Sequence, residues 1–194
     1  MFKRIVLSGI AGAVLVFLMS TVFHLATRLG EVGVKGIANE DAVMATLRSE
    51  IHESGFYYFP GPNMAPGRTK EQMDADNAAY MAKYKAGPNG IIILNTGGED
   101  FNFPKHILNQ FLFSLLSGLL IAWILQVTAA ATSYGTRLGI VIVIAITGAT
   151  IYTLPYWNWY GFPGNYIVAE LVTWTVSWFV AGLAMAKISK PVAA

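Results

Sequence analysis

Between two long apolar segments of the chain lies the stretch Leu154-Pro155-Tyr156-Trp157-Asn158-Trp159-Tyr160-Gly161-Phe162-Pro163. Proline lacks a backbone N–H and resists continuation of a helix, so Pro155 and Pro163 predict a break between the two segments. Tyrosine and tryptophan combine an apolar body with a polar tip, and both collect at membrane–water boundaries. The stretch therefore predicts an aromatic turn over residues 155–163 that lies on such a boundary.

Four apolar segments are each of a length that crosses a bilayer as a helix, which takes roughly 20 residues at about 1.5 Å per residue. They run over Ile5 to Ala26, Ile107 to Val127, Leu138 to Leu154 and Asn165 to Ala186. Hydrophobic residues make up 55% of the chain and charged residues only 12%, which is too apolar for an ordinary soluble domain. The sequence therefore predicts a membrane protein with an all-α, four-helix transmembrane bundle. The first segment is longer than the core of a cleavable signal, so we expect it to remain as a helix.

Residues 28–105 have a different composition and carry most of the formal charges. Asn39-Glu40-Asp41 predicts a helix N-terminus, and Thr69 with Gln72 matches a capping box that opens a second helix ending near Gly87. The apolar runs Phe56 to Phe59 and Ile91 to Leu94 are typical of short strands. We expect a small α+β domain inserted between the first two membrane helices, with parallel strands joined by a crossover as one arrangement.

The predicted domain organisation is therefore a membrane helix in 1–27, an α+β cap in 28–105, and three further membrane helices with the aromatic turn in 106–194. A unit of the cap's size buries little core by itself, so we expect it to lie on the membrane-embedded part, near the aromatic turn.

Basic residues predict which way the chain is threaded. Four crossings place both termini on one side of the membrane. The short segments on that side hold five basic residues and no acidic one, namely Lys3, Arg4, Arg137, Lys187 and Lys190. Because positively charged segments stay in the cytoplasm, we expect both termini there and residues 28–105 outside. In a bacterium this is the inner membrane, with the cap in the periplasm.

The string Pro155-Tyr156-Trp157-Asn158-Trp159-Tyr160-Gly161-Phe162-Pro163 resembles one carried by a family of small bacterial inner-membrane proteins. The similarity extends to the amino-terminal anchor, to Asn39-Glu40-Asp41 and to Tyr84-Lys85-Ala86-Gly87-Pro88. The resemblance implies a bacterial inner-membrane location. It implies no mechanism, because no activity is assigned to those proteins.

Glu170 is the only acidic residue within the four apolar segments. An ionisable group at that depth usually faces protein or water and often marks a functional site. At helical spacing its face continues through Thr173 and Ser177, so we expect a polar stripe that points inward. The predicted cluster, either ligand-binding or structural, consists of Glu170, His24, Gln110, Tyr152, Asn158, Trp157, Trp159 and Trp174. Within this cluster, the expected hydrogen-bond partners of Glu170 are His24, Gln110, Tyr152 and Asn158.

Several classes of function are disfavoured by the residues present. The chain has no cysteine, which excludes disulfides, thiolate metal sites and cysteine nucleophiles. A metal site at His24 and Glu170, or a haem between His24 and His106, would need more ligands or a deeper position, so we expect no metal and no cofactor. Basic residues are not clustered, so we expect no nucleic-acid partner.

We therefore expect a non-catalytic integral membrane protein whose surroundings are the lipid bilayer. It would act as an accessory or assembly subunit with a membrane-protein partner or a second copy, or bind a lipid-like ligand beneath its outer cap. The alternative is a small transporter or proton-coupled membrane enzyme that uses Glu170. A polar cavity running from Glu170 toward Arg137 would favour transport, whereas a closed bundle with an exposed apolar stripe would favour a subunit.

Overall fold

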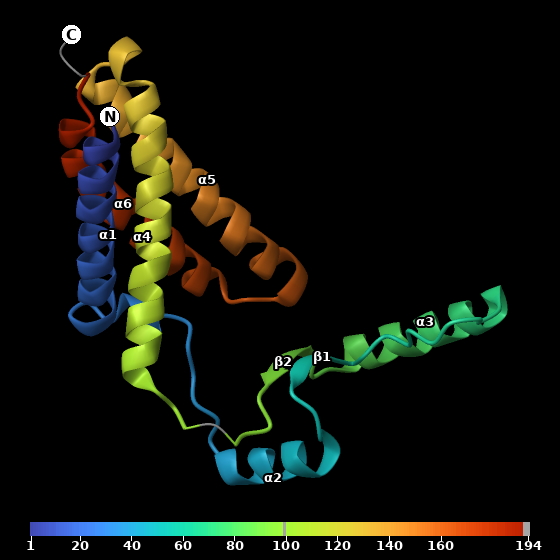
Figure 1. Ribbon diagram of the computed structural model, residues 1–194. Coiled ribbons are helices and arrows are strands. Elements are labelled where there is room, and N and C mark those ends of the chain that lie inside the picture. Colours follow the sequence, from blue (N-terminus) through green and yellow to red (C-terminus); the bar gives the residue numbers. More distant parts are fainter. Residues whose placement is uncertain (99, 192–194) are drawn as a thin grey trace. The chain divides into compact units, whose positions relative to one another are not determined.

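A computed structural model describes residues 1–98 and 100–191 of the chain (Figure 1). The chain divides into two compact units. We call Met1–Val34 with Phe101–Ala194 the helical unit, and Lys35–Asp100 the inserted unit. The last residues of the expected 106–194 segment, 192–194, lie outside the described residues.

The helical unit is built from four helices that are long and apolar enough to cross a membrane. They are α1 (Phe2–Leu25), α4 (Phe103–Val127), α5 (Tyr134–Tyr160) and α6 (Gly164–Ile188). Helix α1 packs against α4 and α6, and α5 packs along α6. The amino-terminus and the end of α6 lie at one end of this unit (Figure 1), which we call the terminal end. The opposite end, where α5 turns into α6, is called the loop end.

Local signals set where the helices of this unit begin. The side chain of Asn102 accepts a hydrogen bond from the backbone N–H of Lys105, so α4 begins four residues before the expected Ile107. The Ser133 side chain caps α5 in the same way by accepting from the N–H of Thr136. Short 3-10 turns precede α5 at Ala129–Ala131 and follow α1 at Leu29–Glu31.

Helix α5 continues through Pro155, so the expectation of a turn is wrong for residues 155–160. Proline removes one helical hydrogen bond, but aromatic packing offsets that loss. The ring centroids of Tyr152 and Tyr156 are 5.3 Å apart, and those of Tyr156 and Tyr160 are 5.6 Å apart. Residues four apart meet on one face only if the backbone stays helical. Gly161, at φ 70°, then ends the helix in the left-handed region.

Small residues let the helices of this unit approach closely. A Cβ atom on Gly118 of α4 would lie 2.5 Å from the carbonyl oxygen of Gly9 on α1. One on Gly12 would lie 2.5 Å from the sulfur of Met185 on α6. At these contacts, small residues allow α1 to pack closely on α4 and α6. The buried core beside them contains Val16, Ile121, Ala122, Leu125, Val141, Ala145, Trp178, Ala181 and Met185.

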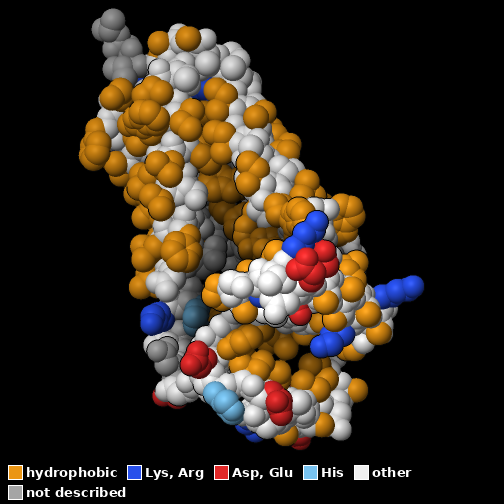
Figure 2. Space-filling model, turned by 90° about the vertical axis from the view of Figure 1, so that its right-hand side faces the viewer, with side chains coloured by type: hydrophobic (Ala, Val, Ile, Leu, Met, Phe, Trp, Pro, Cys, Tyr) orange, Lys and Arg blue, Asp and Glu red, His pale blue; other side chains and the backbone are white. Residues whose placement is uncertain are grey.

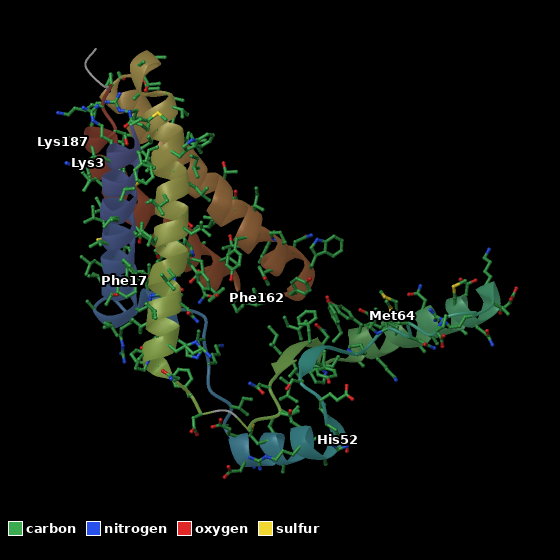
Figure 3. All side chains as sticks on the ribbon, viewed as in Figure 1. Lys3, Phe17, His52, Met64, Phe162 and Lys187 are labelled. Atoms are coloured by element: carbon green, nitrogen blue, oxygen red, sulfur yellow. The ribbon has the colours of Figure 1, made fainter. Side chains whose placement is uncertain are left out.

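At the terminal end, backbone carbonyls near the end of α6 and just beyond it accept hydrogen bonds from side chains of the other three helices. Arg4 of α1 donates to the carbonyls of Lys190 and Pro191, both at 2.6 Å. Buried Arg137 of α5 donates through Nε to the carbonyl of Ala186 at 3.0 Å. Further donors to this end of α6 are Gln126 (to Lys190 O, 3.3 Å) and Tyr134 (to Leu183 O, 3.2 Å). This polar network holds the four helices together where the termini meet. Lys3 and Lys187 lie at the same end (Figure 3).

The inserted unit contains α2 (Glu40–Glu50), β1 (Gly55–Phe59), α3 (Lys70–Ala86) and β2 (Gly90–Leu94). The caps expected at Asn39 and at Thr69 with Gln72 are confirmed, as is the end of α3 at Gly87. The strands pair antiparallel, Gly55 opposite Leu94 and Phe59 opposite Gly90, so a parallel crossover is wrong. Helix α3 has no buried residue, so it does not cover the sheet as a crossover helix would.

The loop between β1 and α3 is tied back to α3. Asp76 of α3 accepts hydrogen bonds of 2.9 Å from both Asn63 and Arg68, so the loop that carries Met64 runs alongside the helix (Figure 3). Figure 2 shows hydrophobic side chains over much of the visible face of the helical unit, whereas charged side chains gather on the inserted unit.

Candidate functional site

Helix α5 diverges from α4 toward the loop end (Figure 1), and an apolar cleft is lined by residues of α4, α5 and α6. Helix α5 packs along α6 and α4 packs along α1, so α4 makes few contacts with either α5 or α6. The cleft has a volume of about 310 Å³. Its walls come from three helices: Ser117 and Ile121 of α4, Ile144, Ala145, Gly148, Ala149 and Tyr152 of α5, and Trp174 and Trp178 of α6. Small side chains form one wall and two indole rings another, so the cleft suits a flexible apolar chain.

Glu170 lies one helical turn from Trp174, which is one of the cleft residues. The indole Nε1–H of Trp174 donates a hydrogen bond of 3.0 Å to Oε2 of Glu170. The carboxyl side chain is half-buried, and Thr173 and Ser177 on the same helix are buried. The inward polar stripe is therefore present. Within residues 1–98 and 100–191, neither of the two ion pairs involves Glu170. Its charge has no cationic partner in this part of the chain.

Two tyrosines lie near this carboxyl. Tyr152 of α5 and Tyr166 of α6 both lie within electrostatic range of Glu170, and each also interacts with Tyr156. Aromatic rings connect α5 and α6 around the loop end. The ring centroids of Tyr156 and Phe162 are 5.2 Å apart, and those of Phe162 and Tyr166 are 5.5 Å apart. Phe162 marks this position in Figure 3. The cleft is therefore apolar along its walls, with a carboxylate and phenol rings toward the loop end.

The structure brings together Glu170, Trp174 and Tyr152 from the cluster expected in the sequence. His24 is exposed, and its Nδ1 pairs with the carbonyl of Ser20 at 2.9 Å. Its ring lies against Gly30, where a Cβ would come within 2.3 Å. Gln110 and Asn158 are both exposed. The hydrogen bond to Glu170 thus comes from Trp174 on the same helix rather than from His24, Gln110, Tyr152 or Asn158, because a side chain four residues away on the helix is already within reach.

The remaining two tryptophans of that cluster lie away from the cleft. Trp157 is 55% exposed and Trp159 is 77% exposed, on the last turn of α5. They have no place among the cleft-lining residues. Their exposure at a helix end is the arrangement found for aromatic side chains at membrane interfaces.

Arg137 belongs to the terminal-end network and does not line the cleft. Its guanidinium group pairs with the carbonyls of Ala186 and Thr132. The cavity beside Glu170 is therefore an apolar cleft, and its lining does not continue to Arg137.

Sequence reasoning missed most of the cleft wall. Ala145 and Ala149 of this wall are both buried. Gly148 and Ser117 gave no separate signal, and Tyr166 was not singled out. The one available signal was the run of small residues on α5, since a helix face without bulky side chains leaves space if its neighbour diverges.

Comparisons with protein-family models, with curated proteins and with solved structures found no match for this chain. In the described ranges, no three histidine, aspartate or glutamate side chains lie together in a way that could hold a metal ion.

Proposed function

We propose that the protein is a non-catalytic integral membrane protein that binds a lipid-like ligand by its apolar chain in the cleft between α4 and α5. The observation that carries this proposal is the cleft itself, about 310 Å³ in volume, with apolar walls and one polar group beside it. Sites for small apolar ligands have this composition: mostly hydrophobic lining with a few placed polar groups.

Insertion in a membrane is part of the same proposal. The outward faces of the long helices carry large apolar side chains, including Phe113, Val143 and Ile151, which are 63%, 64% and 71% exposed. An apolar surface of this extent is unfavourable in water. From the distribution of basic residues we place both termini in the cytoplasm and residues 28–105 outside. The resemblance of the aromatic string to bacterial inner-membrane proteins supports that membrane as the location.

A role in transport is less well supported by the geometry. Transport through the bundle would need a polar path from Glu170 to the opposite end. The described cavity has an apolar lining, and Arg137 is occupied by backbone carbonyls of α6 and of the segment before α5. Binding an apolar chain from the bilayer requires no such path.

The test is photo-crosslinking with an uncharged alkyl glycoside that carries a diazirine on its chain, using the full-length protein in non-ionic detergent. Peptide mapping should find the label concentrated on cleft residues such as Ser117, Ile144 and Tyr152. Labelling spread evenly over the outward faces of the four helices would contradict the proposal.

Two glycines provide a matched pair of variants for this test. A side chain added at Gly148 meets no atom within 4 Å and would project into the cleft, so Gly148→Leu should reduce labelling of the cleft. A side chain added at Gly139 also meets no atom within 4 Å, but Gly139 does not line the cleft. Gly139→Leu should therefore label like the unaltered protein.

A further inference from the structure

The head group of the ligand is indicated by the charge beside the cleft. We propose that the cleft selects an amphiphile whose apolar chain carries a positively charged ammonium head, which would lie against Glu170 and the neighbouring tyrosines. This inference rests on the proposed function, because it identifies the head of the ligand whose chain fills the cleft.

The first argument is the charge of Glu170. Its carboxylate accepts a hydrogen bond from a neutral indole N–H, and among the described residues it takes part in no ion pair. A half-buried carboxylate in an apolar setting is costly unless a cation or several donors compensate it. A ligand with a positive head provides that compensation, whereas an anionic head would be repelled.

The second argument is the set of aromatic rings around the carboxylate. Tyr152 lines the cleft and lies within electrostatic range of Glu170. Tyr166 does not line the cleft, but it also lies within electrostatic range of Glu170. Trp174 both lines the cleft and donates to the carboxylate. Aromatic faces attract ammonium groups, and cages of tyrosine and tryptophan are a common way to bind alkylated ammonium ions. The rings and the carboxylate therefore favour the same chemical group.

The third argument is the direction of the cleft. Its lining runs from Trp178 and Ile121 to Trp174 and Tyr152. Glu170 precedes Trp174 on α6, so it lies beyond that pair toward the loop end. A chain in the cleft would therefore have its head at the end of the helical unit where Trp157 and Trp159 are exposed. Such side chains mark the depth of lipid head groups, so the head would stay close to water.

The experiment is displacement of the uncharged photoactivatable alkyl glycoside by three competitors of equal chain length in non-ionic detergent. The competitors are dodecyltrimethylammonium, an uncharged dodecyl glycoside and dodecanoate. In the unaltered protein we expect the cation to displace the probe at roughly a tenfold lower concentration than the uncharged competitor, since a desolvated cation–π contact with a nearby carboxylate is worth at least that factor. Dodecanoate should displace the probe less effectively than either of the other two competitors.

Variants then assign this preference to Glu170. Glu170→Gln should bring the cationic and uncharged competitors to nearly equal potency and leave the uncharged competitor unchanged. Glu31→Gln removes an exposed acid that pairs with Arg28 in the same unit, and it should leave the ratio as it was. Tyr152→Leu should lower the ratio, whereas Tyr152→Phe, which keeps the ring, should preserve it. This second pair of variants decides the matter if Glu170→Gln does not fold.

The outcomes separate the two proposals. If cation and uncharged competitor act equally on the unaltered protein, or if the cation keeps its advantage in Glu170→Gln, the inference about the head group is wrong and the apolar binding site remains. If the probe does not label the cleft, or if Gly148→Leu has no effect, the proposed function itself is wrong.

Discussion

The carbonyl oxygen of Gly9 on α1 lies 2.5 Å from the position that a Cβ on Gly118 of α4 would occupy. That distance is shorter than any ordinary contact of a carbon atom, so the two backbones touch only because both positions lack side chains. The contact allows α1 and α4 to run close together along their length.

Gly118→Ala should therefore destabilise the helical unit. The added methyl group must push α1 and α4 apart, which costs about 1–3 kcal/mol. Thermal unfolding followed by circular dichroism in detergent measures the change. The control is Gly139→Ala, where the methyl group meets no atom within 4 Å, and it should be neutral or stabilising by up to about 1 kcal/mol. Equal melting temperatures for the two variants would contradict the close contact.

Arg137→Met should destabilise the terminal end. The substitution keeps an unbranched apolar chain but removes the donors to the carbonyls of Ala186 and Thr132. Loss of charged hydrogen bonds at a buried position should cost about 2–3 kcal/mol. Lys187→Met removes one positive charge at the same end from an exposed side chain, so it should leave stability within about 0.5 kcal/mol. Similar losses in both variants would mean that charge, not hydrogen bonding, matters at Arg137.

Two substitutions of Glu170 should have different effects on its hydrogen bond with Trp174. Glu170→Gln retains an oxygen that accepts from the Trp174 indole, so the melting temperature should change little. Glu170→Leu removes the acceptor and leaves the indole N–H unpaired, which should cost about 1–2 kcal/mol. The measurement is thermal unfolding of both variants under the same detergent conditions. A stable Leu variant would show that the hydrogen bond has no structural weight.

The predicted threading can be tested with single cysteines, because the chain contains none. Met64 is 83% exposed in the inserted unit, and Ala131 is exposed between α4 and α5. In intact bacterial cells, an impermeant maleimide should label Met64→Cys, whereas Ala131→Cys should react only after permeabilisation. The opposite pattern would reverse the proposed orientation.

The first turn of α3 should weaken in acid. A backbone hydrogen bond at Glu71, with a further one from the Thr69 side chain, lowers the pKa of the Glu71 carboxyl. The pKa of the Glu71 carboxyl is lower in the folded state than in the unfolded state. The stability that its ionised form contributes is therefore present at a pH above the ordinary glutamate pKa and is lost as the pH falls through the folded-state pKa.

Hydrogen exchange of the first turn of α3, corrected for the intrinsic rate, should show this as faster opening near about pH 3 than near about pH 6. Glu71→Gln should abolish the difference. Glu50→Gln, at the far end of α2, should keep it. An identical pH response in the Glu71→Gln variant would rule out Glu71 as the cause.

Amino-acid sequence by itself determined the features that depend on neighbouring residues. The four apolar segments became four long helices, because length and apolarity along one segment decide whether it can form a spanning helix. The caps at Asn39 and Thr69 and the end of α3 at Gly87 followed from side chains within three residues of the helix end. The Glu170 stripe with Thr173 and Ser177 followed from helical periodicity.

Tertiary structure alone decided the features that depend on packing between distant segments. Helix α5 passes through Pro155 with tyrosine rings in contact along one face, and the two strands of the inserted unit pair antiparallel. The divergence of α5 from α4, and hence the cleft, arises because α5 packs along α6 whereas α4 packs along α1. Such contacts depend on the shapes of two surfaces at once, and no single segment of sequence contains that information.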